Sequence, residues 1–262
     1  LAAYYIKINH DDVKRHLRTF SGFKGRTLNT VTTGMILDWQ CWAIEKHGMS
    51  ARRVNSVMQS MRIAVRYAVK REDLDHDPFK RVNDIPVTQK EKGVLTPAEL
   101  RKLSTISLKD PRLKAIVILG AYCGLRRGEI RGLRWSDIDE EGSVIHVRHN
   151  WINGEGDKIP KCGSIRTVPI ASTVTETLQG LKPFFSTLPM DFVIPSITSP
   201  NKPITDSIFR NGLREVLTSI GIAEDVQRKR NITLHGLRHS FITFARLAGI
   251  SDMEVQAMAG HK

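Results

Sequence analysis

The sequence predicts a two-domain protein that is mostly α-helical, with a small antiparallel β-sheet in its second domain. Three observations support this fold class. Apolar residues recur at helical spacing through most of residues 1–80 and most of 96–262. A charged stretch that contains proline separates the two parts at residues 81–95. Between residues 143 and 170 the apolar pattern changes to a period of two, which indicates strands.

The first domain, residues 1–80, is predicted to be a small helical bundle. We expect helices over residues 9–20, from a cap at Thr33, and from a cap at Ser50 to about Lys70. The third helix has an apolar face and an opposite face that carries four arginines: Arg52, Arg53, Arg62 and Arg66. Charge on a helix usually means a solvated surface. Against a DNA partner, this face would bind the phosphate backbone.

The second domain, residues 96–262, is predicted to begin with a capped helix. Thr96-Pro-Ala-Glu99 combines an N-cap residue, a proline at the first helical position and a capping-box glutamate. A buried helix is expected from about Pro111 to Cys123, because it contains the apolar run Ala115-Ile-Val-Ile-Leu119. It leads directly into an arginine-rich segment that begins at Gly124. Within that segment Arg126 would be held near the domain interior, with Glu129 as an internal partner.

Strands are predicted next, over residues 143–147, 157–161 and 166–170. Gly163-Ser164 separates the last two, so Lys161 is expected near the turn of a hairpin. A lysine there is normally solvated, but it could also reach from the hairpin into a cleft. The remaining expected elements are a short strand at residues 192–195 and helices at 172–181, 206–220, 235–248 and 251–259.

The charge of the chain favours a polyanionic partner. The formal net charge is +13. Residues 1–95 hold 17 Lys and Arg against 10 Asp and Glu, and residues 96–262 hold 23 against 17, so both parts are basic. Because no low-complexity tail carries the excess, the folded surface itself must be basic. This distribution suits nucleic acid bound across two domains, although a merely soluble basic protein remains the alternative.

Other features of the composition exclude some classes of protein. No apolar run approaches the roughly 18 residues that a membrane span needs. The three cysteines lie far apart and show no C-x-x-C spacing, which argues against a disulfide framework and a cysteine zinc site and favours a reducing compartment. The chain begins with Leu1 and shows no signal-peptide pattern, so we expect its natural start to lie upstream.

The stretch Thr233-Leu-His-Gly-Leu-Arg-His-Ser240 is the strongest single candidate for a functional site. It places His235, Arg238 and His239 in the first turn of a predicted helix. A helix N-terminus presents unpaired N–H groups and a partial positive charge, so an added arginine and histidine would suit a phosphate oxygen. In the alternative interpretation, Arg238 pairs with a carboxylate and the histidines are ordinary surface or core residues.

Four motifs, taken together, resemble those of the tyrosine recombinase (phage integrase) family. Gly124-Leu-Arg126-Arg-Gly-Glu129 is similar to the first arginine box of that family. Pro160-Lys161 with Arg166-Thr-Val-Pro169 is similar to its hairpin lysine motif, and His235-Gly-Leu-Arg238-His to its H-x-x-R box. Ala259-Gly-His261 resembles the last histidine box, although the family more often has Leu at the first position. The resemblance covers nearly the whole chain, and residues 1–80 look like the core-binding domain.

The resemblance implies DNA strand cleavage through a covalent 3′-phosphotyrosine, without a metal, ATP or another cofactor. Arg126 and Arg238 would stabilise the extra negative charge of a phosphorane-like transition state. Lys161 would protonate the leaving 5′ oxygen as general acid. His235 and His261 would hydrogen-bond the phosphate. Glu129 and His239 would support these residues without touching the phosphate.

The family also implies partners for this chain. We expect it to bind a duplex recombination site as a two-domain clamp, with residues 81–95 crossing beside the DNA. A homo-tetramer would assemble on paired sites, with accessory DNA-bending proteins as further partners. The expected process is integration or excision of a mobile element such as a phage. The expected location is the cytoplasm of a prokaryotic or phage-infected cell.

The position of the nucleophile is an expectation of its own. The four tyrosines are Tyr4, Tyr5, Tyr67 and Tyr122, and none of them follows the H-x-x-R box. In the family the nucleophile comes shortly after the last histidine box, and this chain ends one residue past His261. We therefore expect the nucleophile beyond Lys262 and no strand cleavage by residues 1–262 alone. Tyr122 lies on an apolar helix and is more simply a core aromatic residue.

Two alternatives from other classes remain open. His235 and His239 are four residues apart on one helix, as in a zinc pair, but Gly236 stands where an H-E-x-x-H hydrolase needs glutamate. Arg238 between the two histidines would also repel a cation. The second alternative is a non-catalytic DNA-binding protein that keeps only the fold.

Overall fold

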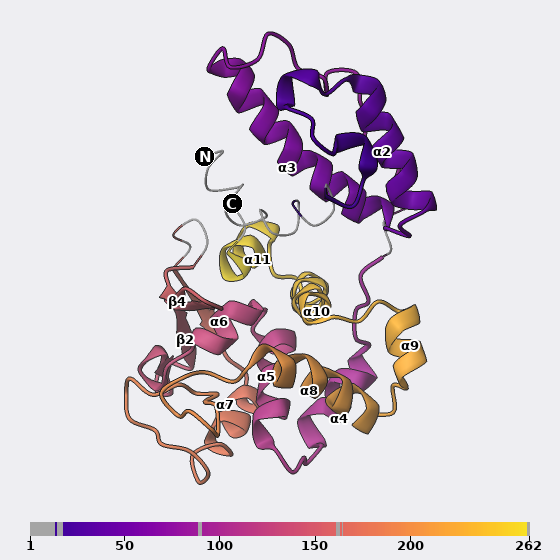
Figure 1. Cartoon of the computed structure of the whole chain (residues 1–262). Helices are drawn as coiled ribbons and strands as arrows, with labels where there is room; N and C mark the ends of the chain where they lie inside the picture. The colour runs from indigo at the N-terminus through magenta and orange to yellow at the C-terminus, as the bar shows by residue number, and fades with distance from the viewer. Residues whose placement is uncertain (1–13, 15–17, 89–90, 161–162, 164, 261–262) are drawn as a thin grey trace. The chain divides into compact units, whose positions relative to one another are not determined.

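The computed structural model describes residues 14, 18–88, 91–160, 163 and 165–260. The chain divides into two compact units, Leu1–Gln89 and Lys90–Lys262, with a boundary inside the stretch predicted as a linker (Figure 1). Among the described residues, no helix is both long enough and apolar enough to cross a membrane.

The first unit is built on two α-helices, α2 (Thr33–Glu45) and α3 (Ala51–Lys70). The Ser50 side chain caps α3 as predicted, whereas α2 is capped by Thr32 and not by Thr33. One face of each helix enters a common core in which Trp39, Ile36 and Met58 are completely buried. Two single-turn 3₁₀ helices, Ser21–Phe23 and Leu28–Thr30, precede them. The helix expected at residues 9–20 lies mostly outside the described residues.

The first part of the predicted linker is anchored to the first unit at a few residues. Val82 is buried in the core of the first unit, and Asn55 exchanges two hydrogen bonds with the backbone of Ile85. The prediction that Arg62 belongs to the exposed arginine face is wrong. Its side chain is buried and donates to the Val82 carbonyl at 2.6 Å and to the Asp84 carboxylate at 2.5 Å. Arg62 therefore fastens the linker to α3, because a guanidinium that loses water must find such partners.

The second unit surrounds one central helix, α5 (Pro111–Tyr122), which is buried over most of its length. Helices α4 (Pro97–Thr105), α7 (Ser172–Gln179), α8 (Asp206–Ser219) and α10 (Leu234–Leu247) pack around it (Figure 1). From Ala115 to Ala121 the helix is apolar on every side, and such a stretch is stable only inside a protein, which is why it forms the centre. The predicted capping box at Thr96 and Glu99 is present at the start of α4.

Two small antiparallel sheets lie in the second unit. Strands β1 (Ile138–Asp139), β2 (Val144–Val147) and β5 (Arg166–Pro169) form one sheet in the order β1-β2-β5. Strands β3 (Asn150–Ile152) and β4 (Gly156–Lys158) form the other. The expected hairpin between the second and third predicted strands is therefore wrong, because β4 pairs with β3 and β5 pairs with β2.

The expected strand at residues 192–195 is also wrong. Phe192 and Pro195 form only isolated bridges, to Arg134 and Pro203. The remaining helices are α6 (Arg127–Gly132), α9 (Glu224–Lys229), α11 (Asp252–Ala259) and a 3₁₀ turn, Trp135–Asp137. No helix was predicted at α6 or α9, which are too short to show a helical apolar period.

Candidate functional site

The site begins where α5 ends and α6 starts. The chain turns at Gly124, whose φ of +62° is a conformation that favours glycine. A Cβ atom there would lie 2.5 Å from the ring of Phe241 on α10. Arg126 then adopts an extended conformation as the N-cap residue of α6. The glycine turn thus lets the arginine box approach α10 closely.

A buried carboxylate organises the arginine box. Glu129, 2% exposed, accepts hydrogen bonds from the Arg126 backbone N–H at 2.7 Å and from Arg126 Nη1 at 2.8 Å. Its two oxygens also receive both Nη groups of Arg166 at 2.9 and 2.7 Å. Burial acts to raise the pKa of Glu129, but the hydrogen bonds and charges of Arg166 and Arg126 outweigh it and lower that pKa. The carboxylate therefore stays ionised, and its stabilisation is lost only as the pH falls below the ordinary range of a glutamate.

Arg238 lies beside this cluster and is almost completely buried, at 1% exposed. Its Nη1 donates to the Gly124 carbonyl at 2.6 Å and its Nη2 to the Ala259 carbonyl. Its Nε is buried without a hydrogen-bond partner among the described residues. The position follows from α10, because Thr233 caps the helix through the Gly236 N–H and orients its first turn. The predicted placement of the H-x-x-R box at the start of a helix is confirmed, with His235 in the first turn and Arg238 at the beginning of the second.

The cluster carries more positive than negative charge. Three guanidiniums (Arg126, Arg166 and Arg238) share the single carboxylate of Glu129, which leaves a formal charge of three minus one, or +2. Burial, followed by the charge of Arg126, lowers the pKa of Arg238 to about 10. A charged group destabilised in this way gains from any anion that reaches it. The arrangement therefore suits a phosphate-like anion.

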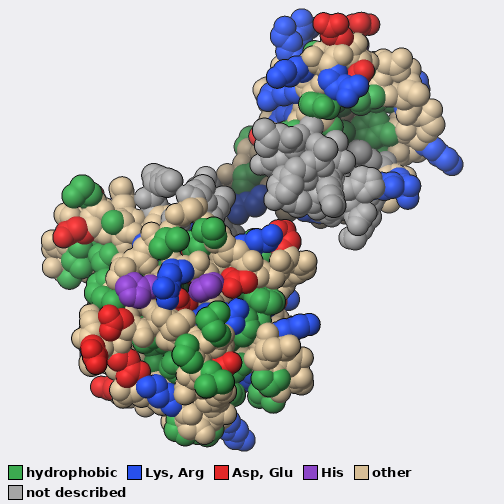
Figure 2. All heavy atoms as spheres, turned by 90° about the vertical axis from the view of Figure 1, so that its left-hand side faces the viewer, with side chains coloured by type: hydrophobic (Ala, Val, Ile, Leu, Met, Phe, Trp, Pro, Cys, Tyr) green, Lys and Arg blue, Asp and Glu red, His purple; other side chains and the backbone are tan. Residues whose placement is uncertain are grey.

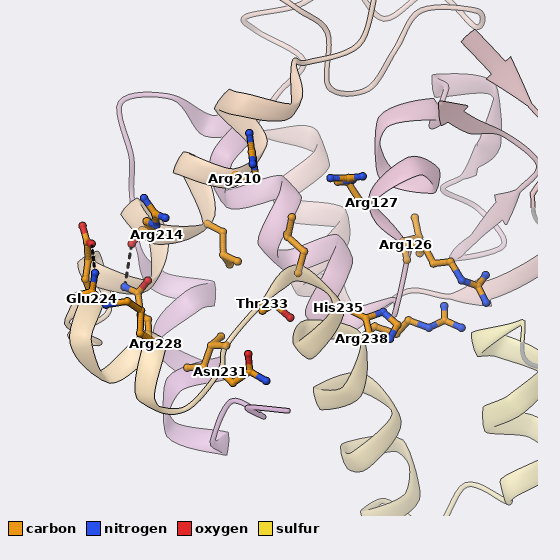
Figure 3. A pocket seen from close by; sticks show the side chains of 15 residues that line it. Arg126, Arg127, Arg210, Arg214, Glu224, Arg228, Asn231, Thr233, His235 and Arg238 are labelled. Carbon is orange, nitrogen blue, oxygen red and sulfur yellow. Dashed lines mark hydrogen bonds and ion pairs between the residues drawn. The ribbon is translucent and has the colours of Figure 1, made fainter. Parts of the chain in front are cut away.

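A groove leads away from the two predicted arginines. It has a volume of about 620 Å³ and lies among α6, α8, α9 and the start of α10. Arg126, Arg238 and the exposed His235 lie at one end of the groove (Figure 3). Its other charged lining residues are Arg127, Arg210, Arg214, Arg228 and Glu224. With six arginines and one glutamate, the groove is strongly basic.

The two histidines of α10 do not resemble a prepared metal site. Their ring centroids lie 4.9 Å apart in an edge-to-face arrangement. The Lys92 ammonium lies 2.9 Å from Nε2 of His239, so that nitrogen accepts a hydrogen bond from a cation. Among the residues that the structure describes, no group of three His, Cys, Asp or Glu side chains is placed to hold a metal ion.

The site brings together four of the predicted residues, Arg126, Glu129, His235 and Arg238, and places His239 next to them. Lys161 and His261 lie outside the described residues. Arg52, Arg53 and Arg66 belong to the first unit, on the exposed or half-exposed side of α3. The sequence-based reasoning did not assign a role to Arg166, Arg210 or Arg214. For Arg166, the sequence did offer a signal, which is its match to the hairpin lysine motif.

An anion should stabilise this unit. We expect inorganic phosphate, compared with chloride at equal ionic strength, to raise the thermal unfolding midpoint, because phosphate would offset the excess charge of the cluster. At a phosphate concentration ten times the dissociation constant, the free energy of unfolding should rise by about 1.4 kcal/mol. Thermal unfolding measures the shift, and Arg238→Met should remove most of it. An equal shift in Arg238→Met and wild type would mean that the anion acts elsewhere.

The chain matches the Phage integrase family model over residues 93–262, and it therefore belongs to this family.

Individual similarities agree with the family assignment. The chain is 27% identical over 248 residues to a tyrosine recombinase XerC-like protein of Caldanaerobacter subterraneus subsp. tengcongensis, covering 82% of this chain and 61% of the relative. The integrase of transposon Tn1549, solved with circular intermediate DNA, is similar in fold with a TM-score of 0.79 at 20% identity. That match covers 97% of this chain and 85% of the other. A lambda integrase tetramer bound to a Holliday junction matches with a TM-score of 0.72 at 19% identity, covering 97% and 70%.

Proposed function

We propose that this chain is the DNA-binding and catalytic part of a site-specific recombinase that breaks and rejoins DNA strands through a 3′-phosphotyrosine intermediate. The expected process is integration or excision of a mobile element. The observation that carries the proposal is the buried cluster of three arginines and one carboxylate at the end of a basic groove. Strand cleavage of a nicked recombination site by the full natural protein tests it.

The cluster suits the charge that develops during attack on a phosphodiester. In the transition state the non-bridging oxygens carry more negative charge than in the ground state. Guanidiniums that are already fixed in place stabilise that charge without reorganising. Arg126 is held by Glu129, and Arg238 by two backbone carbonyls, so both are fixed before DNA arrives. Each would contact the scissile phosphate as a planar donor group.

The remaining chemical roles are proposed from the motifs. Lys161 would give a proton to the leaving 5′ oxygen. His235, which lines the groove beside Arg126 and Arg238, would hydrogen-bond the phosphate, as would His261. Glu129 and His239 would hold their neighbours in place. The bond energy is kept in the phosphotyrosine, so the reaction requires no ATP or other cofactor.

The nucleophile is proposed to lie beyond Lys262. Of the two described tyrosines, Tyr67 is in the first unit. The hydroxyl of Tyr122 donates to the Leu100 carbonyl at 3.0 Å, and burial raises the pKa of this tyrosine. A hydroxyl that is engaged and harder to ionise is a poor nucleophile. Tyr122 is therefore a core aromatic residue with a satisfied hydroxyl, as the sequence predicted.

The basic groove would hold the sugar-phosphate backbone next to the scissile phosphate. Arg210 and Arg214 lie one turn apart on α8 and are both exposed, so they can follow consecutive phosphates. Phosphate contacts of this kind position the duplex and do not depend on its sequence. Figure 3 shows that they extend the line of arginines away from Arg126 and Arg238.

Replacing Arg210 and Arg214 with glutamine should weaken DNA binding uniformly across sequences. The dependence of the logarithm of affinity on the logarithm of salt concentration should lose about 1 unit of slope per arginine. Titrations at several salt concentrations measure this slope. The matched control is Arg101→Gln with Lys109→Gln, two exposed cations that do not line the groove. Equal loss of slope in both double variants would assign the effect to net charge alone.

Both units are proposed to bind the same duplex as a clamp. In the face shown in Figure 2, Lys and Arg side chains lie on the surface of each unit. For the first unit, Arg52, Arg53 and Arg66 remain the proposed backbone contacts, whereas Arg62 is removed from that set by its burial. Assembly as a homo-tetramer on paired sites, with accessory DNA-bending proteins, also stays a prediction.

A further inference from the structure

Arg166 occupies a central position in the arginine cluster, although none of the proposed chemical steps uses it. It is the first residue of β5 and pairs with Val147 of β2, so its backbone belongs to the three-stranded sheet. Its side chain is only 6% exposed. It faces the Glu129 carboxylate with both Nη groups, in the two-pronged geometry that only arginine provides.

The same guanidinium also holds the end of α11. Its Nε donates to the Met258 carbonyl at 2.6 Å. The next two carbonyls of that turn accept from the other two arginines: Ala259 from Arg238 Nη2, and Gly260 from Arg126 Nη2 at 2.9 Å. Three consecutive carbonyls are thus held by three different guanidiniums. The C-terminus of a helix carries partial negative charge, which favours this placement.

Close packing strengthens the link between Arg166 and α11. Gly260 has a φ of +62° and ends the helix in a left-handed conformation. A Cβ atom on Gly260 would lie 3.2 Å from Cδ and Nη1 of Arg166. The backbone of the final turn therefore rests directly on the Arg166 side chain.

We propose that Arg166 is a positioning residue that couples the orientation of the Arg126 guanidinium to the position of the last turn of α11. It acts through two groups that it holds, the Glu129 carboxylate and the Met258 carbonyl. One part of its guanidinium fixes Glu129, which fixes both the backbone and the side chain of Arg126. The other part fixes Met258, so that the turn ending at Gly260 lies against Arg126 and Arg238. This role rests on the proposed function only in so far as the anion is a DNA phosphate.

The test is Arg166→Lys, which keeps the charge but cannot bridge two carboxylate oxygens and a carbonyl at once. Two measurements separate the effect on anion binding from the effect on strand cleavage. Arginine Nε–H resonances recorded by NMR during titration with inorganic phosphate report the anion site itself. Single-turnover cleavage of a nicked duplex by the full natural protein reports the chemistry, and DNA affinity is measured alongside.

We expect Arg166→Lys to weaken inorganic phosphate binding about tenfold and to lower the cleavage rate constant by about a hundredfold at saturating protein, with DNA affinity nearly unchanged. The matched control is Arg112→Lys. Arg112 is also buried, at 2% exposed, and has a comparable pair of contacts to the Asp110 carboxylate, but it lies outside this cluster. Arg112→Lys should lower the thermal stability by a similar amount and leave phosphate binding and strand cleavage unchanged.

A second variant keeps the inference testable if Arg166→Lys folds poorly. Glu129→Asp keeps the charge of the cluster but shortens the side chain, so that it cannot reach Arg126 and both Nη groups of Arg166 together. It should reproduce the loss of phosphate affinity, and the double variant should be no worse than the stronger single variant, because both changes break the same linkage. Unchanged phosphate affinity in Arg166→Lys or Glu129→Asp, or fully additive losses, would overturn the positioning role. Weakened phosphate binding in a protein whose wild type does not cleave DNA would uphold the positioning role and reject the proposed function.

Discussion

Replacing Arg126 or Arg238 with alanine is expected to lower the rate constant of strand cleavage by about 10²–10³, with little change in DNA affinity. A single fixed donor at a developing oxyanion contributes roughly 3–4 kcal/mol to the transition state. Both arginines are held before the substrate binds, Arg126 by Glu129 and Arg238 by the Gly124 and Ala259 carbonyls. Loss of either arginine should therefore raise the free energy of the transition state and leave the free energy of duplex binding nearly unchanged.

Cleavage at saturating protein, together with binding measured separately, tests this expectation. Arg101→Ala is the control, because Arg101 is an exposed arginine on α4 that does not line the groove. The two catalytic variants should differ in stability. Arg126 is 30% exposed in its side chain and Arg238 only 1%, so Arg238→Ala should disturb the fold more. Normal cleavage by either variant would remove that arginine from the proposed mechanism.

Replacing Gly124 with alanine should destabilise the second unit by about 2–4 kcal/mol and should also weaken the anion site. A non-glycine residue at a φ of +62° costs about 1 kcal/mol or more. Forced overpacking against the Phe241 ring, which would lie 2.5 Å from the new Cβ, adds about 1–3 kcal/mol. Since the Gly124 carbonyl holds Arg238, any shift of the turn also moves that guanidinium.

Gly249→Ala separates these contributions. Gly249 has a φ of +84°, but a Cβ atom there would meet nothing within 4 Å. It should therefore show the backbone strain alone, about 1 kcal/mol. Chemical denaturation gives both free energies of unfolding. Equal losses in the two variants would contradict the claim that close approach of α10 is what requires glycine at position 124.

Much of this site could be predicted because its signals are local in sequence. Thr233 and the apolar residues after it identify the first turn of α10, so Arg238 and His235 could be placed on a helix N-terminus. Glu129 lies three residues after Arg126, which made their ion pair predictable. The capping box of α4 and the apolar run Ala115–Ala121 of α5 are equally local features.

Contacts between distant segments could not be predicted. Arg62 looked like a member of an exposed arginine face, but Val82 and Asp84 cover it from 20 and 22 residues away. Arg166 meets Glu129 across 37 residues and Met258 across 92, so its central position emerges only after folding. The hairpin was misassigned for a different reason. Asn153-Gly154, a strong turn signal, lies in the three-residue loop 153–155 that connects β3 to β4, whereas the prediction relied on Gly163-Ser164.

The most direct test of the central claim is covalent trapping on a nicked duplex that carries the recombination site. The full natural protein is expected to form an adduct through a 3′-phosphotyrosine, which mass spectrometry should map to a tyrosine after Lys262. Residues 1–262 alone should bind the same duplex without forming an adduct. An adduct of residues 1–262 through Tyr122 would contradict the proposed position of the nucleophile. Tight binding by the full natural protein without any adduct would contradict the enzyme itself and favour a DNA-binding protein that keeps only the fold.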